Sequence, residues 1–165
     1  MVENEIKTTI DLEPQPELQA DKNSSKAISI GLVANYTDTD ETRFLLTPEG
    51  CGLLTSAGFK IVMEQGAATD ISFPDSAYAE FGAEIASRTE ALKADVVLSY
   101  QTLHVGDIKK MRRGAMLLTM MGDDLFEAPV IKALLDMRIT AGCLDNMMSH
   151  HDVPIFADII DEIDG

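Results

Sequence analysis

Short apolar runs alternate with stretches of helical periodicity along the chain from residue 27 onward. The apolar runs predict strands at 28–33, 59–64, 83–86, 95–100, 115–120 and 139–144. The periodic stretches predict helices at 48–57, 75–81, 89–93, 105–111, 129–137 and 154–163. Continuous apolar strands are typical of parallel sheets that are covered on both faces. This order therefore predicts an α/β fold with a doubly wound, mostly parallel sheet of the Rossmann or flavodoxin-like type.

A helix start follows the first predicted strand. Thr47 can cap the helix with its hydroxyl, Pro48 is preset for the first helical position, and Glu49 suits the positive end of the helix dipole. Arg43 therefore lies between a strand and a helix, and in such folds the crevice beyond the strand carboxyl ends is the usual ligand site. A guanidinium there can hold a carboxylate or phosphate through two hydrogen bonds. The alternative is that Arg43 is a solvated surface charge.

Residues 1–26 are polar and acidic, with two prolines near the middle and a run of Asn and Ser near the end. This composition resists regular structure. We interpret 1–26 as an N-terminal arm and 27–165 as one folded domain. Strand-forming residues within 6–10 would allow the arm to pair with a neighbouring subunit.

The chain of 165 residues carries 13 basic and 28 acidic side chains, which gives a formal net charge of −15. Such a surface repels a phosphate backbone, so nucleic acid is not an expected partner. Cys51 and Cys143 lie far apart in sequence and are interpreted as small core residues rather than as a redox pair or a zinc site. The first 26 residues show no basic head followed by an apolar run. Neither a secretory signal nor a membrane anchor is expected, and the predicted location is the cytoplasm.

Neither a Gly-x-Gly-x-x-Gly nor a Gly-x-x-x-x-Gly-Lys-Ser/Thr motif occurs in the sequence. The end of the first predicted strand, 31–35, lacks the glycines that let a pyrophosphate approach the backbone. The sequence therefore predicts a doubly wound fold without a dinucleotide fingerprint and with no cofactor in this chain. Neighbouring side chains do not converge on one metal ion, so His150 and His151 are not expected to form a metal site. His104 is interpreted as a turn residue or helix cap rather than as a catalyst.

Four segments carry a resemblance to a known family: 43–48 (RFLLTP), 58–67 (GFKIVMEQGA), 73–78 (FPDSAY) and 81–85 (FGAEI). In their order and spacing, the chain from about residue 28 to its last residue resembles the N-terminal domain of the alanine dehydrogenase and pyridine-nucleotide transhydrogenase family. The resemblance implies that Arg43 contacts a substrate carboxylate, as the matching Arg does in the alanine dehydrogenase branch. It also implies that NAD or NADP binds to a further domain of the full-length protein.

Two positions depart from the alanine dehydrogenase pattern. The second Lys of a Lys-x-Lys-Glu-Pro segment, which contacts substrate in that branch, falls on Gln101. Gln101 can hydrogen-bond a carboxylate without the charge that strengthens such a bond, and a surface Gln at a strand end is the alternative interpretation. The acid–base His of that branch falls on Gly122, where Asp123 or Asp124 can serve as the ionisable group or simply cap the following helix. The Arg and Gln loop of the transhydrogenase branch has no counterpart in 145–151.

Two hypotheses follow for function. In the first, the chain is the substrate-side N-terminal domain of an NAD(P)-dependent oxidoreductase, a fragment that lacks its dinucleotide-binding domain. Arg43 and Gln101 then bind a small carboxylate such as a 2-oxo or amino acid. The isolated chain is expected to be inactive, and the parent protein to be a homo-oligomer. In the second hypothesis, the chain is a non-catalytic module that binds a small anion or a protein partner on the same scaffold.

Overall fold

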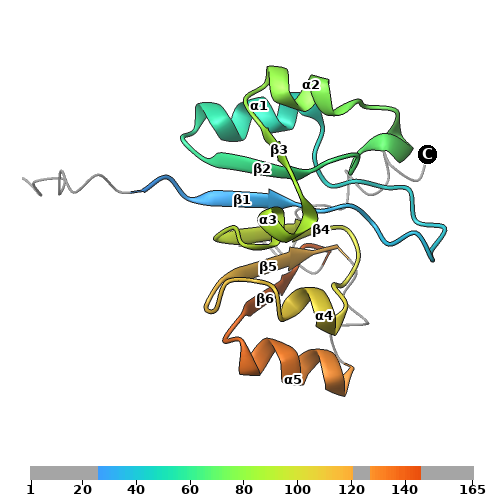
Figure 1. Cartoon of the computed structure of the whole chain (residues 1–165), viewed down its shortest axis with the longest axis vertical. Helices are drawn as coiled ribbons and strands as arrows, with labels where there is room; N and C mark the ends of the chain where they lie inside the picture. Colours follow the sequence, from blue (N-terminus) through green and yellow to red (C-terminus); the bar gives the residue numbers. More distant parts are fainter. Residues whose placement is uncertain (1–25, 121–126, 146–165) are drawn as a thin grey trace, which may run out of the picture.

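Six parallel strands form one sheet in the computed structural model, which describes residues 26–120 and 127–145 (Figure 1). The strands are β1 Ser29–Leu32, β2 Lys60–Glu64, β3 Glu84–Ala86, β4 Val96–Ser99, β5 Met116–Thr119 and β6 Thr140–Cys143. Their order in the sheet is β3-β2-β1-β4-β5-β6, so the direction of winding reverses between β1 and β4. The predicted doubly wound α/β fold is confirmed, and each predicted strand end agrees with the structure to within one residue.

Helices connect successive strands throughout the described ranges. They are α1 Pro48–Ser56, α2 Asp75–Glu80, α3 Arg88–Leu92, α4 Val105–Ile108 and α5 Ala128–Asp136, with a 3₁₀ turn, η1, at Thr69–Ile71. The sequence pattern did not predict η1. It also extended α4 to residue 111, whereas the residues after Ile108 form turns: the backbone N–H groups of Lys110 and Met111 donate to carbonyls three residues back.

Local signals define the ends of α1 as predicted. The Thr47 hydroxyl accepts a hydrogen bond from the backbone N–H of Gly50 (3.2 Å), and Pro48 occupies the first helical position. Gly58 follows the helix with a φ of 95°, a conformation that glycine adopts without strain. At α3, Ser87 and Glu90 form a reciprocal capping box, which was not identified from the sequence.

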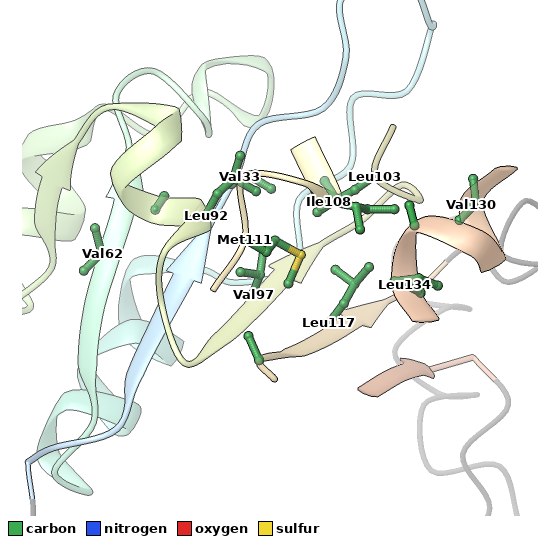
Figure 2. Close-up of a cluster of buried hydrophobic side chains, with 13 residues drawn as sticks. Val33, Val62, Leu92, Val97, Leu103, Ile108, Met111, Leu117, Val130 and Leu134 are labelled. Carbon is green, nitrogen blue, oxygen red and sulfur yellow. The ribbon is translucent and has the colours of Figure 1, made fainter. Parts of the chain in front are cut away.

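The helices cover the two faces of the sheet unequally. Helices α1 and α2 pack over β1, β2 and β3, and α3, α4 and α5 pack on the opposite face (Figure 1). Figure 2 shows the hydrophobic core between the sheet and helices α3, α4 and α5, in which Val97 and Leu117 from the sheet meet Ile108 from α4 and Leu134 from α5. Leu117 is fully buried, and such burial contributes about 1.5–3 kcal/mol for a side chain of this size.

Strand β1 and helix α3 approach each other closely at Gly31. A Cβ atom added to Gly31 would collide with the carbonyl oxygen of Ala91 in α3. The glycine is therefore required for packing between the central strand and the helix. This close packing brings the start of α3, with Arg88 as its first residue, next to the carboxyl end of β1.

Some predictions concern residues outside the described ranges, namely 1–25, Gly122, Asp123, Asp124, His150, His151 and 154–163. The interpretation of the cysteines as core residues holds for Cys51, which is fully buried, whereas Cys143 is half-buried on the edge strand β6. No helix in the described part of the chain is long and apolar enough to cross a membrane.

Candidate functional site

The loop between β1 and α1 projects beyond the carboxyl ends of the strands (Figure 1). Asn35 holds this loop from within, because its side-chain amide donates to the backbone carbonyls of Arg43 (2.6 Å) and Glu41 (3.2 Å). At the far end of the loop, the Tyr78 hydroxyl donates to the carbonyl of Leu46 (2.7 Å). The segment that carries Arg43 is thus fixed at both ends to the body of the domain.

The Arg43 guanidinium lies at the carboxyl edge of the sheet and is paired with Glu41. Its Nε and Nη2 atoms each lie 2.8 Å from a carboxylate oxygen of Glu41, and the Arg43 backbone N–H donates to the same group (2.9 Å). The guanidinium carbon lies 4.8 Å from the ring centroid of Tyr100, the residue after β4. Hydrogen bonds from Arg43 hold the pKa of the Glu41 carboxyl below its usual range. Arg43 therefore makes a two-pronged carboxylate contact of the predicted kind, but with a carboxylate of its own chain.

Gln101 lies on the neighbouring β4–α4 loop and lines a cleft of about 340 Å³. Its side-chain oxygen accepts a hydrogen bond from the backbone N–H of Tyr36 (3.0 Å), and its side-chain NH2 donates to the Thr39 hydroxyl (2.7 Å). The two candidate residues are thus on adjacent loops, since Arg43 contacts Tyr100 and Gln101 is the next residue. Arg43 is not among the described residues that line the cleft.

The cleft lies where the sheet changes its direction of winding, between the loops after β1 and β4 and the start of α5. Its walls combine aromatic, polar and aliphatic side chains. They include Tyr36, Gln101, His104, Glu127, Pro129 and Val130. Ligand crevices of doubly wound folds occupy the same topological position, and the volume lies within the range of small-molecule sites.

Tyr36 and His104 form a parallel stack in this cleft. Their ring centroids are 3.6 Å apart with an interplanar angle of 7°. The Tyr36 hydroxyl donates to Asp107 (2.7 Å) and accepts from the backbone N–H of His104 (2.9 Å). Burial and the hydrogen bond to Asp107 raise the pKa of Tyr36 to about 12, so the phenol stays protonated at neutral pH.

Arg88 supports the stack from the other side of the Tyr36 ring. Its guanidinium carbon lies 4.7 Å from the ring centroid, and its Nη1 atom donates to Glu64 (2.8 Å) and to the Ala34 carbonyl (3.0 Å). Its Nε atom donates to Asp107 (2.9 Å). Burial favours the neutral form, but Glu64 and Asp107 outweigh it and raise the pKa of Arg88. This ion-pair cluster joins the ends of β1 and β2 to helices α3 and α4.

Tyr36, Arg88, Glu64 and Asp107 were not identified from the sequence. Their partners are distant along the chain, and the Tyr36–Asp107 pair is separated by 71 positions. His104 occupies the N-cap position of α4, as interpreted, but its side chain makes no capping hydrogen bond. The stack with Tyr36 accounts for its position instead.

Two backbone N–H groups of the β1–α1 turn are engaged within the domain itself. A pyrophosphate needs glycines and open backbone N–H groups at this turn, but the Ala34 N–H donates to Glu64 and the Tyr36 N–H donates to Gln101. Within residues 26–120 and 127–145, no group of three or more His, Cys, Asp or Glu side chains is placed to hold a metal ion. The cleft is lined by side chains that can form hydrogen bonds with a small polar molecule.

The fold and this cleft define a doubly wound α/β domain with a cleft at the switch point and no nucleotide fingerprint in its sequence. Residues 31–158 match the family model described as alanine dehydrogenase/PNT, N-terminal domain, and the chain belongs to this family. An NAD(P) transhydrogenase alpha subunit of Rhodospirillum rubrum is 36% identical over 114 residues, which are 65% of this chain and 29% of that protein. Alanine dehydrogenase 1 of Staphylococcus aureus is 30% identical over 73 residues, which are 44% of this chain and 20% of that protein.

Solved structures give a consistent result. The transhydrogenase from Sinorhizobium meliloti superimposes with a TM-score of 0.65 at 28% identity, over 74% of this chain and 36% of that one. An L-alanine dehydrogenase superimposes with a TM-score of 0.66 over 76% of this chain and 35% of that one, but at 19% identity it supports the fold only. The chain thus spans less than a third of the length of the Rhodospirillum relative and little more than a third of either structure.

Proposed function

We propose that this chain is the substrate-side domain of an NAD(P)-dependent oxidoreductase, and that Arg43 and Gln101 contribute to a site for a small carboxylate. The dinucleotide is expected to bind to a separate domain of the parent protein, because the β1–α1 turn of this domain is occupied by its own hydrogen bonds. We further propose a cytoplasmic location and a homo-oligomeric assembly. Size-exclusion chromatography with light scattering of the full-length protein tests the assembly.

The single observation that supports this proposal most is the placement of Arg43. Its guanidinium is ordered against the Tyr100 ring and a carboxylate at the carboxyl edge of the sheet, and its side chain is 32% exposed. An arginine that already holds a carboxylate through two parallel hydrogen bonds has the geometry to hold that of a ligand. In the parent protein, a substrate held there would be positioned next to the cofactor of the other domain.

A second candidate function is supported by the same contact. Because Glu41 offsets the charge of Arg43, the edge of the sheet has less attraction for an anion than an unpaired arginine would have. This favours a non-catalytic module that binds a small anion weakly or contacts a protein partner. The reading frame beyond Gly165 separates the two functions. A Gly-x-Gly-x-x-Gly motif between a strand and a helix supports the oxidoreductase, and its absence supports the module.

Substitution of Arg43 tests the carboxylate site directly. A charge-assisted hydrogen bond contributes about 1.5–3 kcal/mol, so Arg43→Ala should weaken pyruvate binding by about ten- to a hundredfold. Arg43→Lys should recover only part of the affinity, because an ammonium group does not match both carboxylate oxygens in one plane. Isothermal titration calorimetry of the 165-residue chain provides the measurement.

Arg113→Ala is the matched control. The Arg113 guanidinium donates to the carbonyl of Asp136, and the variant has the same charge change. Equal pyruvate affinities for wild type and Arg43→Ala would show that Arg43 is not a carboxylate ligand and would leave the binding module as the better interpretation.

A further inference from the structure

The β4–α4 loop contributes three polar residues to the cleft, Gln101, Thr102 and His104. Thr102 is buried, and the other two differ in what their side chains already contact. Both hydrogen-bonding ends of Gln101 are in use: the oxygen accepts from the Tyr36 N–H and the NH2 donates to Thr39. A ligand that bonded to Gln101 would have to replace these contacts or use the remaining lone pair or amide hydrogen. Gln101 therefore has the environment of a residue that braces the β1–α1 loop.

His104 has the opposite environment. One face of its imidazole lies on the Tyr36 ring at a centroid distance of 3.6 Å, which fixes the plane of the ring. The residue is exposed, and neither ring nitrogen hydrogen-bonds to any residue of the described ranges. A neutral imidazole carries one donor and one acceptor, and an imidazolium carries two donors. The cleft thus contains an oriented imidazole whose nitrogens have no protein partner among those residues.

Three contacts hold the Tyr36 ring on which His104 stacks. Tyr36 is held through its backbone N–H by Gln101, through its hydroxyl by Asp107, and on the opposite ring face by Arg88. Because the rings are parallel and close, a shift of Tyr36 would move His104 as well. Preorganised groups bind ligands more tightly because less side-chain freedom is lost on binding.

We propose that His104, and not Gln101, is the side chain of the β4–α4 loop that hydrogen-bonds to the ligand in this cleft, and that Gln101 is a positioning residue for the β1–α1 loop. The ligand class is that of the proposed function, on which this inference rests: a small carboxylate with a carboxylate or keto oxygen that accepts a hydrogen bond from the imidazole. This assignment exchanges the roles expected from the sequence, where Gln101 was the substrate ligand and His104 a turn residue or cap.

The variant His104→Phe isolates the imidazole nitrogens, because phenylalanine keeps an aromatic ring to stack on Tyr36. Loss of one hydrogen bond should weaken pyruvate binding by about three- to tenfold, with little change in the unfolding midpoint. In wild type, addition of pyruvate should shift the ring NMR signals of His104. These signals are assigned by their loss in His104→Phe, since the chain contains three histidines.

Gln101→Leu tests the positioning role. The backbone N–H of Tyr36 loses its acceptor in this variant, so its hydrogen exchange should accelerate. Gln101→Glu keeps an oxygen for the Tyr36 N–H and should restore slow exchange. Weaker pyruvate binding by Gln101→Leu without faster hydrogen exchange at the Tyr36 N–H would mean that Gln101 is itself the ligand contact, and it would overturn the assignment.

Calorimetric titration of pyruvate into wild type, His104→Phe, Gln101→Leu and Arg43→Ala separates the outcomes. Weaker binding by His104→Phe together with shifted His104 signals supports the inference, whatever the result for Arg43→Ala. Weaker binding by Arg43→Ala with unchanged binding by His104→Phe overturns the inference and leaves the proposed function in place. His104 signals that do not move at saturating or millimolar pyruvate also overturn it.

Discussion

Replacement of Arg88 by Met should destabilise the domain strongly, although Arg88 has no predicted role in binding. The guanidinium donates to Glu64, Asp107 and the Ala34 carbonyl, and its side chain is 22% exposed. Hydrogen bonds between charged groups contribute about 1.5–3 kcal/mol each when buried, and partial exposure reduces this value. Both carboxylates keep other donors in the variant, the Ala34 N–H for Glu64 and the Tyr36 hydroxyl for Asp107.

We therefore expect Arg88→Met to lower the free energy of unfolding by about 2–4 kcal/mol, which corresponds to a decrease in Tm of about 5–15 °C for a domain of this size. Urea unfolding followed by far-ultraviolet circular dichroism is the suitable assay, because the chain contains no tryptophan. The double variant Arg88→Met/Asp107→Asn should recover part of the loss, since in the single variant Asp107 keeps only the half-exposed Lys110 as a cation, at 3.3 Å.

Arg113→Met is the control for Arg88→Met. It removes the same charge from an exposed site and should change the free energy of unfolding by less than about 0.5 kcal/mol. If Arg88→Met is no more destabilising than this control, the cluster around Arg88 does not hold the ends of β1 and β2 together. The support inferred for Tyr36 would then be wrong as well.

Two further predictions concern stability. Gly31→Ala should cost about 3 kcal/mol or more, because its Cβ would collide with the Ala91 carbonyl, whereas Gly106→Ala, with open space around the added atom, should be neutral or slightly stabilising in a thermal melt. Burial opposes ionisation of Asp107, but hydrogen bonds from Tyr36 and Arg88 outweigh it and lower its pKa. The stabilisation from this carboxylate is therefore present above its unfolded pKa of about 4 and is lost as the pH falls through the lower folded value. Asp107→Asn should flatten that acid limb in urea titrations at several pH values, and an unchanged limb would contradict the assignment.

The order of strands and helices and the position of Arg43 were predictable because their signals are local. The Thr47-Pro48 helix start lies only a few residues after Arg43, and its cap forms with Gly50 in the same turn. Apolar runs likewise identified each strand without reference to its neighbours in the sheet. These predictions needed the propensities and capping preferences of short segments and nothing about the tertiary structure.

The contacts of the site side chains were not predictable in this way. Gln101 was a ligand candidate because a substrate-contacting Lys of the resembled alanine dehydrogenase branch falls on it, but its amide is engaged by Tyr36 and Thr39, which precede it by 65 and 62 positions. No local signal marked His104 as a ligand candidate, because Tyr36, the ring on which it stacks, lies 68 positions earlier in the chain. A pattern along the chain identifies which loops meet at the switch point, but it does not show which side chains bind to each other when the loops meet.

The charges at the carboxyl edge limit how an anionic ligand can reach this site. Two guanidinium groups, those of Arg43 and Arg88, lie against the three carboxylates of Glu41, Glu64 and Asp107. The cluster has no excess positive charge, and the whole chain carries −15. The net negative charge of the chain therefore repels a carboxylate at long range. Added salt should speed the association of the carboxylate by screening this repulsion. Under the proposed function, affinity for a carboxylate would come from short-range geometry, that is, from oriented donors such as the Arg43 guanidinium and the His104 imidazole.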